Sequence, residues 1–221
     1  MLHKVEFRLI GKDIRKSFGR LLVFDSINFE LINGSSLAIA GKNGSGKSTL
    51  VKIIAGLLSP SSGEVIYQVD GREIDKLDWF KFVGFVAPYL QLYDEFTGYE
   101  NLEILAKIRG LKSYEAKIKN VLERVNLYSR RDDLVRGYSS GMKQRLKYAC
   151  ALLHDPIVLI LDEPTSNLDS EGVEMVWAIA EEQKKNGILI VATNEPEELK
   201  MCDEVINLDE LKLKMKRQIV K

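Results

Sequence analysis

The fold of this chain is decided by residues Gly41-Lys42-Asn43-Gly44-Ser45-Gly46-Lys47-Ser48-Thr49, which match the phosphate-binding pattern G-x-x-x-x-G-K-[ST] at every defined position. An apolar run at residues 37–41 precedes the loop, as a buried strand would. Residues 49–58 follow it with apolar side chains at helical spacing. Between a strand and a helix, a glycine-rich turn points backbone N–H groups at phosphate oxygens. We therefore predict that the chain binds a nucleoside triphosphate here.

Four side chains in and beyond this loop have expected roles of their own. Lys47 is expected to lie along the β- and γ-phosphates, and the Ser48 hydroxyl is expected to ligate Mg²⁺. Asp162 and Glu163 follow the apolar run 157–161, which is typical of a central parallel strand. Open α/β sheets bind ligands at this end of their strands. We expect Asp162 to hold Mg²⁺ by way of water, and Glu163 to accept a proton from the water that attacks the γ-phosphate.

The composition narrows the class of protein. Thirty-two basic and 32 acidic residues give a formal net charge of +0, whereas a nucleic-acid binder usually carries a basic excess. The basic tail 212–221 is interpreted as a solvated terminal strand or helix face rather than a membrane-binding segment. Cys150 and Cys202 lack metal-ligand spacing, and Cys150 is expected on a buried helix face. With no bilayer-length apolar run and no signal-peptide pattern, a cytoplasmic chain is expected, reaching a membrane only through a partner.

The order of the elements predicts an α/β fold. Residues 5–14 and 24–31 are expected to be strands of an antiparallel sheet with one solvated face. Strands and helices then alternate, which is typical of a mostly parallel sheet. The helical block at about 88–153 is expected to be inserted into this core as a subdomain of its own.

Two further motifs resemble those of a known family. Residues 138–145, which contain Ser139, Ser140 and Gly141, resemble the L-S-G-G-Q signature of ABC-type ATPases, and residues 166–169 resemble their D-loop. The resemblance runs from Phe18 to Leu208. It implies a single ABC nucleotide-binding domain over residues 1–221, built on a P-loop NTPase core.

The resemblance also implies how ATP and Mg²⁺ would be bound. Two such chains, like or unlike, would form a head-to-tail dimer. ATP would lie between the phosphate loop of one subunit and the signature residues 139–141 of the other. Phe18 would lie against adenine by this resemblance, whereas taken alone it is interpreted as a core residue.

Several positions depart from the family pattern. Pro88 stands where the family carries a glutamine that reaches Mg²⁺ and the attacking water, and Gln91 comes three residues later. Asn194 stands in place of a histidine; its amide still hydrogen-bonds to a γ-phosphate but carries no charge. Ser140 and Met142 replace glycine and glutamine in the signature. Since Lys47 and Glu163 are kept, we expect slow ATP hydrolysis rather than none.

Three functions fit these residues. The first is the ATP-hydrolysing subunit of an ABC transporter, held at the inner face of the membrane by a separate transmembrane permease that docks near residues 89–101. The segment 92–102 and the Met142 signature look more like exporters than nutrient importers. The second is an ATP-gated dimerisation module with very slow turnover, and the third is a soluble ABC ATPase acting on ribosomes or DNA. The balanced charge gives no sign of the basic surface that this third function, acting on ribosomes or DNA, would need.

Overall fold

The computed structural model describes residues 6–219, with side chains through Leu213. Two long strands, β1 (Phe7–Phe18) and β2 (Leu21–Ile32), pair antiparallel, and β1 also pairs antiparallel with β4 (Ser62–Val69). A two-residue strand, β5 (Arg72–Glu73), completes this sheet in the order β2-β1-β4-β5. The predicted antiparallel N-terminal sheet is confirmed.

Strand β1 is longer than the sequence predicted. It continues to Phe18, so residues 16–18, which lie beyond the predicted strand at 5–14, also pair with β2. The register shifts between Gly11 and Ile14, where Asp13 has a φ of 45°. A bulge of this kind interrupts the alternation of side chains without ending the strand.

The second sheet is parallel throughout and carries the predicted site at its edge. Its order is β6-β7-β8-β3-β9, with the bounds β3 (Ser36–Ala40), β6 (Val83–Val86), β7 (Val158–Asp162), β8 (Ile188–Thr193) and β9 (Glu204–Asn207). Every residue of β3, β7 and β8 is buried, which explains their continuous apolar sequences. The predicted α/β class with a mostly parallel sheet is confirmed.

The helices that flank this sheet are α1 (Lys47–Ile54), α5 (Ser170–Asn186), α6 (Pro196–Leu199) and α7 (Leu208–Ile219). Between β6 and β7 the chain forms α2 (Gly98–Ile108), α3 (Tyr114–Arg124) and α4 (Ser140–Leu152). Short 3₁₀ helices lie at η1 (Lys76–Lys81), η2 (Tyr128–Arg130) and η3 (Val135–Gly137). Helix α1 begins two residues before the predicted start and ends four residues before the predicted end. The predicted basic tail falls on α7, but its side chains from Lys214 onward and residues 220–221 lie outside the described part.

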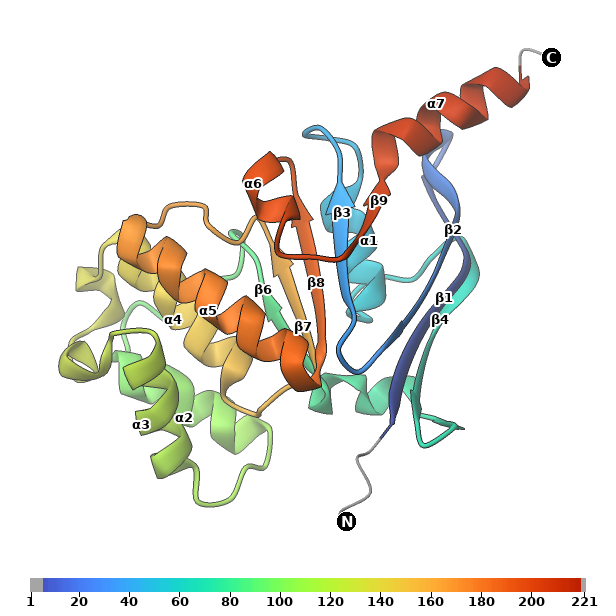
Figure 1. The fold of residues 1–221 in the computed structure, drawn as a ribbon. Helices are drawn as coiled ribbons and strands as arrows, with labels where there is room; N and C mark the ends of the chain where they lie inside the picture. The colour runs from blue at the N-terminus through green and yellow to red at the C-terminus, as the bar shows by residue number, and fades with distance from the viewer. Residues whose placement is uncertain (1–5, 220–221) are drawn as a thin grey trace.

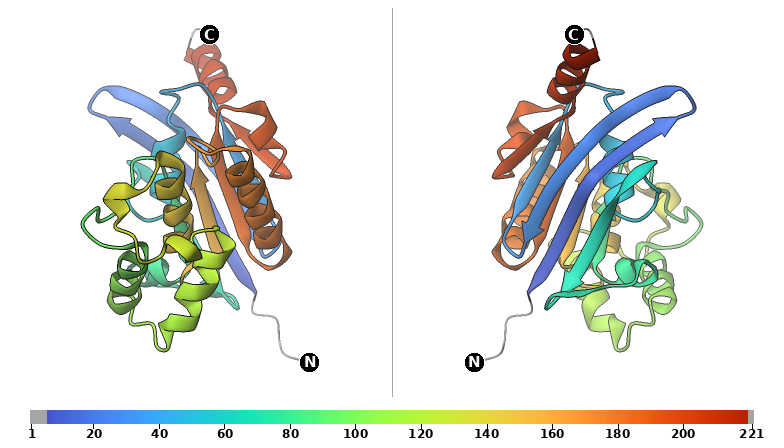
Figure 2. Two further views of the ribbon diagram at one scale, coloured as in Figure 1. Left: turned by 90° about the vertical axis from the view of Figure 1, so that its left-hand side faces the viewer. Right: turned by 90° about the vertical axis from the view of Figure 1, so that its right-hand side faces the viewer.

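The parallel sheet lies between two cores. On one face, α1 packs between the parallel and the antiparallel sheet, so that Leu50 of α1, Leu9 of β1 and Ile160 of β7 share one apolar cluster (Figure 1). On the other face, Leu161 and Val191 pack against the helices α2 to α5. Figure 2 shows the helical block at the opposite side of the molecule from the β1–β2 hairpin. The carboxyl ends of the parallel strands are thereby left at one edge for a ligand.

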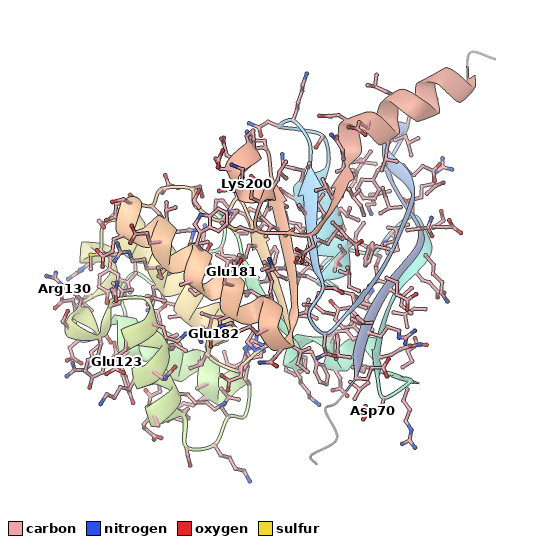
Figure 3. The ribbon with its side chains drawn as sticks, viewed as in Figure 1. Asp70, Glu123, Arg130, Glu181, Glu182 and Lys200 are labelled. Carbon is pink, nitrogen blue, oxygen red and sulfur yellow. The ribbon has the colours of Figure 1, made fainter. Side chains whose placement is uncertain are left out.

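Charges of both signs are spread over the outer surface. Figure 3 labels Glu123 and Arg130 on the helical block, Glu181 and Glu182 on α5, and Lys200 after α6. Glu123 and Arg130 each form an ion pair with a neighbouring residue of opposite charge. None of the helices within residues 6–219 has the length and apolar character needed to cross a bilayer.

Candidate nucleotide-binding site

The loop after β3 has a conformation that depends on its glycines. Gly41, Gly44 and Gly46 have φ values of 152°, 78° and 111°, in the region that favours glycine. A Cβ atom on Gly46 would lie 2.5 Å from Cγ1 of Val23, so the strand β2 presses directly against the loop. The backbone therefore wraps tightly ahead of α1, as a phosphate-binding loop requires.

Lys47 and Ser45 place polar groups inside the loop. Lys47 is buried, and its Nζ donates hydrogen bonds to the carbonyl oxygens of Gly41 at 2.8 Å and Lys42 at 3.3 Å. The Ser45 hydroxyl is buried without a partner among the described residues. The backbone N–H of Lys42 is held by the Asp209 carboxylate at 2.8 Å. Asn43 and Gly44 are exposed at the tip of the loop, and Thr49 is half-buried in α1.

Asp162 is the last residue of β7 and is 1% exposed. Burial raises the pKa of Asp162, and the neighbouring Ser48 hydroxyl acts against that rise. The positive charges of Lys47 and Lys52 also act against it. Neither carboxylate oxygen has a hydrogen-bond partner within residues 6–219. A buried carboxylate without a partner is costly, so this site is suited to a cation.

A carboxylate and a hydroxyl are oxygen ligands of the kind Mg²⁺ prefers, so Asp162 and Ser48 fit this ion. Over the described residues there is no group of three or more histidine, cysteine, aspartate or glutamate side chains placed to hold a metal. The remaining ligands would be phosphate oxygens and water, as is usual for Mg²⁺ in phosphoryl-transfer sites.

Glu163 has an uncommon backbone conformation. Its φ of 51° lies in the left-handed region, and its N–H donates to the carbonyl of Ala192 at 2.8 Å. A non-glycine residue held in this region stores strain, which proteins concentrate at functional sites. The strand therefore ends at Asp162, and the chain turns sharply at the residue predicted to be the general base.

Two buried residues that the sequence analysis missed fix the segment after Glu163. The Glu198 carboxylate of α6 accepts hydrogen bonds from the N–H of Thr165 at 3.2 Å and from its hydroxyl. The Tyr148 hydroxyl of α4 donates to the carbonyl of Pro164 at 2.7 Å. Burial, followed by the charge of Glu198, raises the pKa of Tyr148, so the phenol keeps its proton. No local pattern reveals these residues, because their partners lie 33 and 16 positions away.

The signature residues lie at the beginning of α4. The Ser139 hydroxyl caps the helix by accepting a hydrogen bond from the N–H of Met142 at 3.2 Å. Ser139 and Ser140 are exposed, and a Cβ on Gly141 would lie 3.4 Å from the carbonyl oxygen of Asn167. The structure thus brings the signature and the predicted D-loop side by side.

Phe18 and Asn194 lie at the ends of their strands. Phe18 is 51% exposed, with Nζ of Lys16 at 4.8 Å from the centre of its ring. It is therefore not a core residue. Asn194 follows β8 and is exposed, with its Nδ2 3.4 Å from the Glu195 carboxylate.

The segment after β6 contains Pro88 and Gln91. Pro88 and Tyr89 form a turn, closed by a hydrogen bond from the N–H of Leu90 to the carbonyl of Ala87 at 3.2 Å. Gln91 lines a groove of about 400 Å³ between the end of α1, the strand β6 and the helices α2 and α4. The structure therefore places Gln91 in the wall of this groove rather than in the predicted metal site.

Comparisons with known proteins agree with this geometry. A family model described as "ABC transporter" matches residues 24–166. The chain is 34% identical to the lantibiotic transport ATP-binding protein SrtF of Streptococcus pyogenes, over 83% of this chain and 78% of that protein. It is 35% identical to the putative hemin import ATP-binding protein HrtA of Staphylococcus haemolyticus, over 92% of this chain and 98% of that protein. A solved structure of an ATP-binding subunit of an ABC transporter superposes with a TM-score of 0.80 at 28% identity, covering 90% of this chain and 85% of that one.

Proposed function

Because the chain belongs to the ABC transporter family of ATP-binding proteins, we propose that it hydrolyses ATP to power a separate membrane-spanning permease. The observation that carries this proposal is the Asp162 carboxylate, which is buried next to Ser48 and a complete phosphate loop and has no hydrogen-bond partner in the part of the chain that the structure describes. Mg²⁺ bound there would neutralise charge on the phosphate oxygens. Residues 1–221 would form one nucleotide-binding domain, with residues 88–153 as its helical insertion.

The residues of the site divide the chemistry between them. The backbone N–H groups of the phosphate loop and Lys47 hold the β- and γ-phosphates. Glu163 takes the proton of the attacking water, and Asn194 donates a hydrogen bond to the γ-phosphate from the end of β8. Because Pro88 offers no side-chain ligand and Asn194 carries no charge, we infer that turnover is slow.

A second subunit completes the site. The exposed Ser139 and Ser140 at the N-terminus of α4 offer hydroxyl groups and the positive end of a helix to a phosphate. In a head-to-tail dimer, the signature residues 139–141 of one chain would cover the ATP held by the other. Phe18, exposed at the end of β1, would lie against the adenine.

The groove that contains Gln91 is suited to a permease. Four large apolar side chains in its wall are exposed: Leu57 by 63%, Phe80 by 49%, Tyr93 by 59% and Ile108 by 74%. A concentration of exposed apolar side chains of this kind marks an interaction surface. Binding there would hold the chain at the cytoplasmic face of the membrane. The exporter-like segment 92–102 favours export as the direction of transport.

Phosphate release by the purified chain, measured against its own concentration, tests the proposal. A rate that rises faster than linearly with protein concentration is expected for an active homodimer. Glu163→Gln and Lys47→Ala should both abolish that rate. A rate at the blank level with ATP still bound would favour the second candidate, an ATP-gated dimerisation module, for which Pro88 and Asn194 are the specific observations.

A further inference from the structure

The turn after β6 is fixed from several sides. Pro88 is the first of its two central residues, where the proline ring presets the backbone φ at about −65°. The carbonyl of Pro88 accepts a hydrogen bond from Nζ of Lys147 on α4 at 2.6 Å. This turn therefore holds the next residue, Tyr89, in a defined place.

The ring of Tyr89 packs against the phosphate-loop helix. Nζ of Lys52 on α1 lies 4.1 Å from the centre of the ring, and the ring of Phe85 lies 6.4 Å away on the β6 side. A lysine over the face of an aromatic ring is attracted by it. Lys52 follows Ser48 by four residues in α1, so the two side chains lie on the same face of the helix. Tyr89 is thus held over the helix face that carries Ser48.

The strand register brings Tyr89 to the same edge as Asp162. Strands β6 and β7 lie side by side and run parallel (Figure 1). Val86 pairs with Leu161, the residue before Asp162. The turn that presents Tyr89 therefore begins level with Asp162. Burial and then the charge of Asp162 raise the pKa of Tyr89, which agrees with this closeness and keeps the phenol protonated. Tyr89 is nevertheless 45% exposed, so a ligand can reach it.

We propose that Tyr89 is a positioning residue of the magnesium site, whose hydroxyl hydrogen-bonds to water carried by the cation that Ser48 and Asp162 hold. A phenol both donates and accepts hydrogen bonds, so it can orient such a water. The side chain of Pro88 has no polar group, so the neighbouring Tyr89 supplies the polar group of this turn. This inference rests on the proposed ATP site and adds a residue to it.

Nucleotide affinity measured with Mg²⁺ and with EDTA tests the role of Tyr89 without any need for turnover. The probe is a fluorescent ATP analogue, titrated into the purified wild-type chain, Tyr89→Phe and Tyr93→Phe. Tyr89→Phe keeps the ring over Lys52 and removes only the hydroxyl. The ratio of affinity in Mg²⁺ to affinity in EDTA should fall about tenfold in Tyr89→Phe, as it does when outer partners of a metal site are removed. Tyr93→Phe, exposed in the nearby groove, should keep the wild-type ratio.

Asp162→Asn separates failure of this inference from failure of the site itself. If Asp162→Asn removes the magnesium effect and Tyr89→Phe keeps the wild-type ratio, the role of Tyr89 is overturned and the site stands. An equal loss of affinity in Mg²⁺ and in EDTA for Tyr89→Phe would mark a structural residue and overturn it as well. If Asp162→Asn also keeps the wild-type ratio, the assignment of the metal to Asp162 is wrong, and the role of Tyr89 fails with it.

Discussion

The phosphate loop after β3 and the turn after β6 end at the same edge of one parallel sheet, yet they depend on different chemistry. The phosphate loop acts mainly through backbone N–H groups, and its glycines meet every requirement of the sequence pattern. We propose that the turn after β6 acts through the side chain of Tyr89, whereas Pro88 beside it offers no side-chain ligand. From this difference we infer that the phosphate loop holds the nucleotide itself, whereas side chains after β6 and β8 act on the magnesium ion and the γ-phosphate and thereby limit turnover.

The largest effect is expected in the phosphate loop. Lys47→Ala removes the buried ammonium group that lies on the loop carbonyls, so ATP affinity should fall by about 10–100-fold, as expected for the loss of hydrogen bonds between charged groups. Equilibrium binding of labelled ATP measures this loss. Lys42→Ala is the matched control, because Lys42 lies in the same loop but is exposed. Equal affinities for both variants would contradict the assignment of Lys47 to the phosphates.

A substitution in the groove that contains Gln91 should reduce membrane binding of the chain and leave ATP binding unchanged. Ile108→Asp places a charge on an apolar side chain that is 74% exposed in the groove wall. The salt-resistant membrane-bound fraction of the chain in its own cells should fall about tenfold, since docking would desolvate that charge. ATP binding should not change.

Val205→Asp provides the control for the groove. Val205 is 52% exposed on β9, at the opposite edge of the parallel sheet from β6. Its substitution should leave the membrane-bound fraction at the wild-type level. Equal losses in Ile108→Asp and Val205→Asp would show that any surface charge releases the chain, and the groove would lose its proposed role.

A smaller effect, on stability, is expected for the hydrogen bond that Tyr148 of α4 donates to the segment after β7. Tyr148→Phe leaves the buried carbonyl of Pro164 without its donor, so the free energy of unfolding should fall by about 1–2 kcal/mol. Urea denaturation followed by circular dichroism measures this change. Tyr93→Phe removes an exposed hydroxyl and should change the free energy of unfolding by less than about 0.5 kcal/mol. A stability of Tyr148→Phe equal to that of the wild type would mean that the carbonyl finds another partner.

The sequence predicted the elements whose signals are local. The fully buried β7 follows from the apolar run 157–161, and the tight loop ahead of α1 follows from its glycine-rich pattern. The continuation of β1 to Phe18 was missed, because register shifts between Ile14 and Ser17 break the alternation on which a strand prediction depends.

The support of the site could not be predicted, because it depends on contacts between distant segments. Glu198 contacts Thr165 from another element, and nothing in the sequence around Glu198 distinguishes it from a solvent-exposed acid on a short helix. The place of Gln91 likewise depends on a turn that is held by the hydrogen bond from Lys147 and by the packing of Tyr89 on Lys52. Local sequence patterns therefore predicted which residues form the candidate site, whereas the contacts that hold those residues in place come from distant segments.

The most direct test of the contrast between binding and turnover is the rate of phosphate release at saturating ATP for the wild-type chain and Asn194→His, with ATP affinity measured on the same samples. Histidine is longer than asparagine and can carry a charge toward the γ-phosphate. We predict a rate about tenfold higher for Asn194→His and an ATP affinity within about twofold of the wild type. An unchanged rate, or a rate that rises only in proportion to affinity, would contradict the claim that the residues facing the γ-phosphate limit turnover.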